Sequence, residues 1–354
     1  RGVDSATNQI VIGDTAIGLG SNTTVLGSTD TTQTKLFGDV NATGAYQKDG
    51  VTILDYDATL FNVAVGEGAL ASASLTGTYN VASGYESLYS NTTGYYNVAT
   101  GAYSLFSNTT GNYNTASGMR SLHNNTTGNY NTASGYQSLY NNTTGVSNTA
   151  SGYQSLYANT TGHNNTATGR QNLFYSTTGS INTATGIANL YQNTTGGYNT
   201  ATGYQNLHNN TTGNYNTASG MRSLHNNTTG HNNIASGTYS LYSNTTGGYN
   251  VASGYASLYY NTTGNYNTAT GTNSLYSNTT GNYNIASGYQ AGRYQADGTT
   301  ALTVANDSIF IGRDTRGVES ATNQIVIGDT AIGLGSNTVV LGADTITTTA
   351  LKGN

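Results

Sequence analysis

An internal repeat limits what this chain can fold into more than any other feature of its sequence. Successive copies begin at Ala82 and Ala99, so the unit is seventeen residues long, and twelve complete copies run to Ile285 without an insertion or a deletion. Positions 1, 3, 7 and 16 are always Ala, Gly, Leu and Asn, and positions 11–13 always read Thr-Thr-Gly. A register kept this strictly predicts a solenoid, in which each repeat packs mainly on its two neighbours.

The length of the unit indicates the kind of solenoid. Seventeen residues are too few for a helix pair and show no helical period, but they suit one turn of a β-solenoid. We expect two short strands in each coil, at Asn-Thr-Ala-Ser/Thr-Gly and at Tyr-Gln-Ser-Leu-Tyr. Asn-Thr-Thr-Gly is expected to be a turn, because Gly accepts positive φ and Asn and Thr bond the local backbone. At about 4.8 Å per coil, the twelve copies would be roughly 55–60 Å long.

Equivalent positions of successive coils should form columns along the stack. Position 7 predicts a buried apolar column, position 16 a column of Asn amides that bond from coil to coil, and position 8 a column of aromatic or His rings. The twelve copies carry almost no charge, which fits because like charges stacked at this spacing repel. The predicted structural columns consist of Leu88, Leu105, Leu122, Leu139, Leu156, Leu173, Leu190, Leu207, Leu224, Leu241, Leu258 and Leu275, and of Asn97, Asn114, Asn131 and Asn148.

Composition removes several classes of protein. The chain has 47 Gly and 30 Tyr, no Pro, Cys or Trp, and only 7% charged residues, whereas disordered chains usually combine high charge with much Pro. A net charge of −5 provides no basic stripe for nucleic acid. We find no signal peptide and no apolar run as long as a membrane helix requires. The expected partners therefore include neither nucleic acid nor a membrane.

The sequences on either side of the array use a shorter, related unit. Asn8–Gly13 reads NQIVIG and is followed fourteen positions later by the related NTTVLG at Asn22–Gly27, and a similar pair recurs at Asn323–Gly328 and Asn337–Gly342. The expected division of the chain is residues 1–63 for N-terminal β-roll repeats with a connector, 64–288 for the array, and 289–354 for C-terminal β-roll repeats.

This flanking pattern resembles the YadA-like head repeat of trimeric autotransporter adhesins, which also occurs in bacteriophage tail fibres. Asn62–Gly66 leads into the array with the same signature, so the array looks like an expanded version of that repeat. The resemblance implies a left-handed β-roll of three parallel chains. The ending Thr349–Asn354 is similar to the stretch that precedes an intramolecular chaperone in many phage fibres.

Together these features predict an all-β fibre, a parallel homotrimer with no cofactor. Its function would be that of a stiff spacer in attachment to a host or a surface, as part of a phage tail fibre or a bacterial adhesin. The expected location is extracellular, on a virion or on a cell surface. Besides the chain itself, a cell-surface glycan or receptor is the candidate partner.

Carboxylates provide little support for catalysis. The array contains one Glu, no Asp and no Lys, so it lacks the paired carboxylates of acid–base catalysis. Asp55, Asp57 and Glu67 have no hydrolase spacing. Flanking acids such as Asp14, Asp314 and Asp329 lie in Gly-containing turns and are expected to bond their own backbone. We therefore predict that the chain is not an enzyme.

Histidines, asparagines and tyrosines have structural interpretations. His123, His208 and His225 each replace an aromatic residue at position 8 of a different coil, which favours ring stacking over a metal site. The Asn-Thr-Thr turns are formal glycosylation acceptors, but the turn itself accounts for them. Tyrosines at position 15 could stack on sugar rings or pack neighbouring coils and chains, and we favour packing.

Two alternatives to an attachment fibre stay open. Thr-Ala-Thr in some copies, such as Thr166–Thr168, would suit an ice-binding solenoid, although Ser, Val or Ile interrupts the row elsewhere. The return of Arg1–Asn8 as Arg316–Asn323 would suit the subunit of an extracellular filament.

Overall fold

The computed structural model describes residues 10–12, 24–26, 46–48, 51–57, 59–343 and 345–346. The chain forms two compact units, Arg1–Gly44 and Ala45–Asn354. In the first, strands β1 (Ile10–Ile12) and β2 (Thr24–Leu26) pair in parallel. Asp14 and the two stretches 1–8 and 349–354, which carry part of the sequence interpretation, lie outside the described residues.

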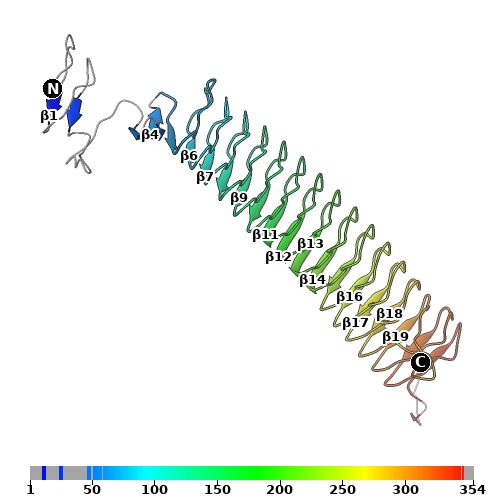
Figure 1. The fold of residues 1–354 in the computed structure, drawn as a ribbon. Coiled ribbons are helices and arrows are strands. Elements are labelled where there is room, and N and C mark those ends of the chain that lie inside the picture. Colours follow the sequence, from blue (N-terminus) through cyan, green and yellow to red (C-terminus); the bar gives the residue numbers. More distant parts are fainter. Residues whose placement is uncertain are drawn as a thin grey trace, which may run out of the picture. The chain divides into compact units, whose positions relative to one another are not determined.

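The second unit contains a parallel β-solenoid of about 16 turns, with no helix among the described residues (Figure 1). Strands β5 to β21 pair in parallel, each with the next, so the predicted all-β solenoid class is confirmed. The strands of the ladder are β5 (Asn62–Val65), β6 (Val81–Ser83), β7 (Val98–Thr100), β8 (Thr115–Ser117), β9 (Thr132–Ser134), β10 (Thr149–Ser151), β11 (Thr166–Arg170), β12 (Thr183–Ile187), β13 (Thr200–Tyr204), β14 (Thr217–Met221), β15 (Ile234–Ser236), β16 (Val251–Ser253), β17 (Thr268–Thr270), β18 (Ile285–Ser287), β19 (Ile309–Ile311), β20 (Ile325–Ile327) and β21 (Val339–Leu341).

Two antiparallel strands precede the parallel ladder. Strand β3 (Tyr46–Lys48) pairs with β4 (Val51–Asp57), and β4 pairs with β5, with Leu54 opposite Val65. A solenoid otherwise presents an open strand edge at its end, to which another chain could add. The antiparallel pair covers that edge at β5.

Each array coil contains one strand, so the prediction of two strands per coil is wrong. The segment expected as the second strand is a run of turns, in which positions 5 and 7 take left-handed φ, such as 52° at Gln154 and 51° at Leu156. Position 15 is left-handed as well. A left-handed L-residue costs about 1–2 kcal/mol, so neighbouring coils must hold these turns in place.

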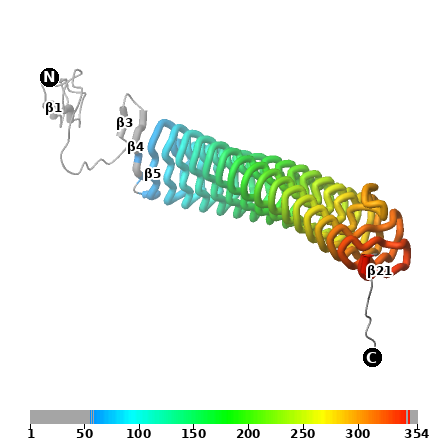
Figure 2. The backbone as a smooth tube through the Cα atoms, turned by 90° about the horizontal axis from the view of Figure 1, so that it is seen from below, coloured from blue at the N-terminus to red at the C-terminus, as the bar shows by residue number. Residues whose placement is uncertain are grey.

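Hydrogen bonds between coils continue through the turns. The Leu156 amide donates to the Asn172 carbonyl of the next coil at 3.0 Å, and the Gln154 amide donates to Tyr136 of the preceding coil at 3.0 Å. The stack is therefore bonded around most of its circumference, although strands occupy only one side. Figure 2 shows the resulting row of similar coils from a second direction.

The interior of an array coil is small and partly polar. Ala at position 1 and Leu at position 7 are at most 1% exposed in all twelve copies, and the twelve predicted leucines are the largest side chains there. Buried polar side chains at positions 6, 10 and 16 fill the rest. Because unpaired buried polar groups are unfavourable, the fold depends on their hydrogen bonds.

Asparagine at position 16 meets this requirement with a ladder from Asn62 to Asn284. In a typical rung, Asn114 Nδ2 donates to Asn97 Oδ1 at 3.1 Å and to the Gly128 carbonyl at 2.8 Å. Asn114 Oδ1 accepts the backbone amide of Asn131 at 3.0 Å. The asparagine side chain thus supplies hydrogen-bond partners for backbone amides and carbonyls that a turn would leave unsatisfied.

Position 10 carries a second asparagine ladder, which explains the glycine at position 13. Asn108 Nδ2 donates to Asn91 Oδ1 at 2.8 Å and to the Gly111 carbonyl at 3.0 Å. A Cβ on Gly111 would lie 2.4 Å from Asn108 Oδ1 and 2.5 Å from the Gly128 carbonyl oxygen. Its φ lies outside the left-handed region, so close approach rather than positive φ requires this glycine.

The interior changes composition where the array meets the C-terminal coils. Phe310 of β19 takes the place of alanine and is fully buried. Gly292 stands where the repeat has leucine, and a Cβ there would lie 2.8 Å from the Phe310 ring. The large Phe310 side chain in the alanine column is therefore accommodated by the absence of a side chain at Gly292 in the leucine column.

Candidate functional site

The outer surface of the array carries a continuous column of rings at position 8, called here the ring column. Successive ring centroids are 5.0–5.3 Å apart and the planes are inclined by 4–20°. Its members are Tyr89, Phe106, His123, Tyr140, Tyr157, Phe174, Tyr191, His208, His225, Tyr242, Tyr259 and Tyr276. The constant register of the repeat places the rings at the spacing between coils, so they stack without further adjustment.

The three histidines are part of this stack. His208 and His225 are 5.1 Å apart with nearly parallel rings, and each bonds the asparagine that follows it through Nδ1. Burial lowers the pKa of His225, and nearby His208 and Arg222 lower it further. Among the described residues, no three His, Asp or Glu side chains lie close enough to share a metal ion.

A second column, at position 15, is interrupted and more exposed. Five rings stack from Phe61 to Tyr130, with centroids 4.9–5.3 Å apart, and a shorter run contains Tyr249, Tyr266 and Tyr283. Tyr130 is 59% exposed, so each ring packs on its neighbours along the column while its edge faces solvent. Burial, followed by neighbouring tyrosines, raises the pKa of Tyr113 in this column.

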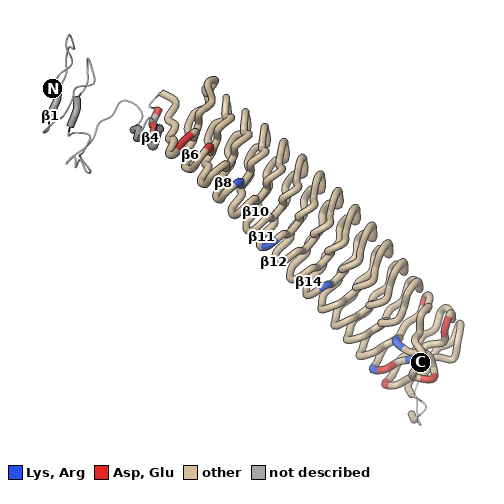
Figure 3. The backbone as a smooth tube through the Cα atoms, viewed as in Figure 1, with Lys and Arg blue, Asp and Glu red and all other residues tan. Residues whose placement is uncertain are grey.

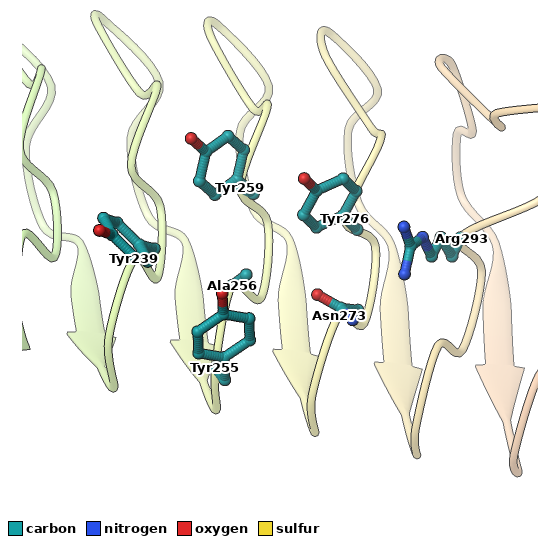
Figure 4. A pocket seen from close by; sticks show the side chains of 7 residues that line it. All are labelled: Tyr239, Tyr255, Ala256, Tyr259, Asn273, Tyr276 and Arg293. Carbon is teal, nitrogen blue, oxygen red and sulfur yellow. The ribbon is translucent and has the colours of Figure 1, made fainter.

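A hollow of about 460 Å³, called here the terminal groove, lies beside the end of the ring column (Figure 4). It owes its shape to position 5, which neighbours position 8 across the turn. Tyr239 fills that position in one coil, but the next two coils have Ala256 and Asn273, whose shorter side chains leave space. Tyr255, Tyr259 and Tyr276 complete the aromatic lining.

Arg293 ends the ring column at the terminal groove, because it occupies position 8 of the following coil. Its guanidinium carbon lies 4.5 Å from the ring centroid of Tyr276 and 4.8 Å from that of Tyr294. Two rings therefore hold the cation by cation–π contact. Within the described part of the chain, Arg293 forms no ion pair, and its buried Nε has no hydrogen-bond partner.

Sequence reasoning did not single out the terminal groove, although one signal was present. Arg293 breaks the aromatic pattern of position 8, and position 5 changes from Tyr239 to small residues over the preceding coils. That these two positions are neighbours follows only from the left-handed turn between them.

Of the three carboxylates considered as catalytic candidates, two line one hollow and the third does not. Asp55 and Asp57 line a hollow of about 70 Å³, which Glu67 does not line. Asp57 accepts the backbone amides of Thr59 and Leu60, at 2.8 and 3.0 Å, and so caps a turn.

The two described acids expected to bond their own backbone pair with arginines instead. Asp329 accepts two hydrogen bonds from Arg313, at 2.7 and 2.8 Å, and Asp314 pairs with Arg316 at 2.9 Å. That expectation was wrong because it ignored the arginines nearby, one brought alongside Asp329 by the neighbouring coil and one two residues from Asp314 in the chain. Charged residues are concentrated near the ends of the described solenoid and are sparse between them (Figure 3).

Comparison with protein-family models, with curated proteins and with solved structures found no match to this chain. In the described residues, no helix is long and apolar enough to cross a membrane.

Proposed function

We propose that the chain is a rigid segment of an attachment fibre, such as a phage tail fibre or a bacterial surface adhesin. It holds a receptor-binding end away from its anchor, so its function depends on length, stiffness and multivalency. The observation that carries this proposal is the coil-to-coil bonding of strands and turns from β5 to β21, to which asparagine side chains add within the array. At about 4.8 Å per coil, 16 turns span roughly 75–80 Å.

The assembly we propose is a parallel homotrimer. Apolar side chains are exposed in the C-terminal coils, where Leu334 is 76%, Val339 62% and Ile346 51% exposed. Exposed apolar surface of this kind is suited to contact with a second copy. The resemblance of the flanking sequences to YadA-like head repeats supports the same arrangement.

Mass and shape test the proposal together. Light scattering should give about three times 36.6 kDa, and electron microscopy should show straight, uniform rods. A compact monomer would contradict the fibre, whereas open-ended polymers would favour the filament alternative.

A second candidate, ice binding, is favoured by one feature of the strands. In β11, β12 and β13, threonines on both sides of the buried alanine point outward, and Thr166, Thr183 and Thr200 lie in register. Ser219 ends this double row in the next coil. A thermal hysteresis measurement tests the candidate, and a Thr183→Tyr variant should abolish any activity.

A further inference from the structure

The terminal groove has the lining of a carbohydrate site. Four tyrosines, the buried Ala256 and the amide of Asn273 line it together with Arg293 (Figure 4). Aromatic faces pack against the C–H faces of sugar rings, while phenol and amide groups bond hydroxyls. A volume of about 460 Å³ is within the usual range for small-ligand sites.

Charge narrows the class of sugar. Arg293 is the one charged residue that lines the terminal groove, and no carboxylate of the lining neutralises it. Its guanidinium carbon lies close to the rings of Tyr276 and Tyr294, and it forms no ion pair among the described residues, so its terminal N–H donors are left for a ligand. A planar donor set of this kind recognises a carboxylate with two parallel hydrogen bonds.

We propose that the terminal groove binds an acidic saccharide of the uronic-acid type. The carboxylate bonds Arg293, one pyranose ring packs between Tyr255 and Tyr259, and Asn273 bonds a hydroxyl. This inference rests on the proposed attachment function, since it names the chemistry of the receptor.

Binding of tetragalacturonate to the full-length protein, measured by calorimetry, tests the inference. The fully methyl-esterified tetramer is the matched neutral ligand. We expect a Kd of about 1 mM or tighter for the acid and binding at least about tenfold weaker for the ester. Equal binding of both would overturn the role of Arg293, and no binding of either would overturn the site.

Substitutions at two positions locate the binding. Arg293→Gln removes the charge and should weaken binding at least about tenfold, whereas Arg293→Lys should retain part of it. Ala256→Tyr should fill the terminal groove without changing charge, and position 5 accepts tyrosine, as Tyr103 and Tyr239 show. Unchanged binding by Ala256→Tyr would place the sugar elsewhere and overturn the inference.

Ala188→Tyr is the matched control, because Ala188 occupies position 5 of a coil outside the groove. It should bind tetragalacturonate as the wild type does, and all variants should keep the wild-type melting temperature. Mass and rod length do not depend on the terminal groove. A trimeric rod without uronate affinity would refute this inference alone, and a uronate-binding monomer would refute the fibre alone.

Discussion

The array and the C-terminal coils fill the same solenoid in different ways. An array coil encloses one leucine, one alanine and three polar side chains, and the asparagines at positions 10 and 16 bond to their equivalents in neighbouring coils. From β19 onward, Phe310 and Val326 fill the interior. The asparagine ladder of position 16 gives way there to Ser308 and Gln324.

This difference accounts for the number of residues in each coil. Array strands pair at a constant step of one repeat unit. From β18 onward the number of residues between paired positions varies. Ile285 pairs with Ile309, Ile309 with Ile325, and Ile325 with Val339. A hydrogen-bonded asparagine needs its partner at one position and one angle. Apolar packing is non-directional, so a C-terminal coil can gain or lose residues in its loops.

The largest expected effect comes from breaking the register of the array. Deleting Ala150 to Thr200 removes three whole units, so the protein should fold and its rod should shorten by about 14 Å. Deleting only Ala150 to Thr194 removes a length that is not a whole number of units. This second deletion should prevent folding, because every column beyond the junction is displaced. Circular dichroism and electron microscopy distinguish these outcomes.

The matched control for that experiment lies in the C-terminal coils. Two glycines inserted after Gly298, in the loop between paired Tyr294 and Ala301, should leave the melting temperature nearly unchanged. If this insertion prevents folding as the register-breaking deletion does, the C-terminal coils do not tolerate changes in loop length better than the array does.

The next largest effect concerns the apolar part of an array coil. Leu156→Asp would bury a charge without a partner and should lower the free energy of unfolding by more than about 4 kcal/mol. Denaturant unfolding measures this change. Tyr153→Asp, at a side chain that is 47% exposed, is the control and should have a small effect. Similar melting of both variants would contradict the assignment of inside and outside.

Much of this interior could be predicted from the sequence, because invariant positions mark it. Leucine at position 7 and asparagine at position 16 recur in every copy, and both are buried. The turn conformation could not be predicted in the same way. Leucine does not prefer left-handed φ, and it adopts this conformation at Leu156, where its amide bonds the Asn172 carbonyl of the next coil and its carbonyl accepts the Asn159 amide of its own coil.

The terminal groove was beyond sequence reasoning for a related reason. Its residues come from four successive coils, and positions 5 and 8 become neighbours only through that unexpected turn. The glycine at position 13 illustrates the same limit. Its invariance was visible, but its cause, the asparagine oxygen 2.4 Å from a Cβ at Gly111, needed the three-dimensional stack.

A smaller effect is expected from repairing the one gap in the position 10 ladder. Ser176 replaces asparagine there, and the buried oxygens Asn159 Oδ1 and Ser176 Oγ have no hydrogen-bond partner. Ser176→Asn should restore the ladder and raise the free energy of unfolding by about 1–3 kcal/mol. The reciprocal variant Asn142→Ser should create the same gap and lower stability similarly. Denaturant midpoints that do not move in opposite directions would show that this ladder contributes little.

The smallest expected effect is a pH dependence that arises in the ring column. Burial lowers the pKa of His225, so the unfolded chain binds this proton more readily than the folded chain does. The stabilising contribution of neutral His225 is therefore complete above the ordinary pKa of 6.5 and is lost as the pH falls from there to the lower folded pKa. His225→Tyr keeps a ring in the column, as Tyr242 does in the next coil, and should reduce the loss of melting temperature between pH 8 and pH 5. His231→Asn, at an exposed position outside the ring column, should leave that loss as it is in the wild type. If both variants change this loss of melting temperature equally, the pH dependence comes from exposed histidines in general and not from the stacking of His225 in the ring column.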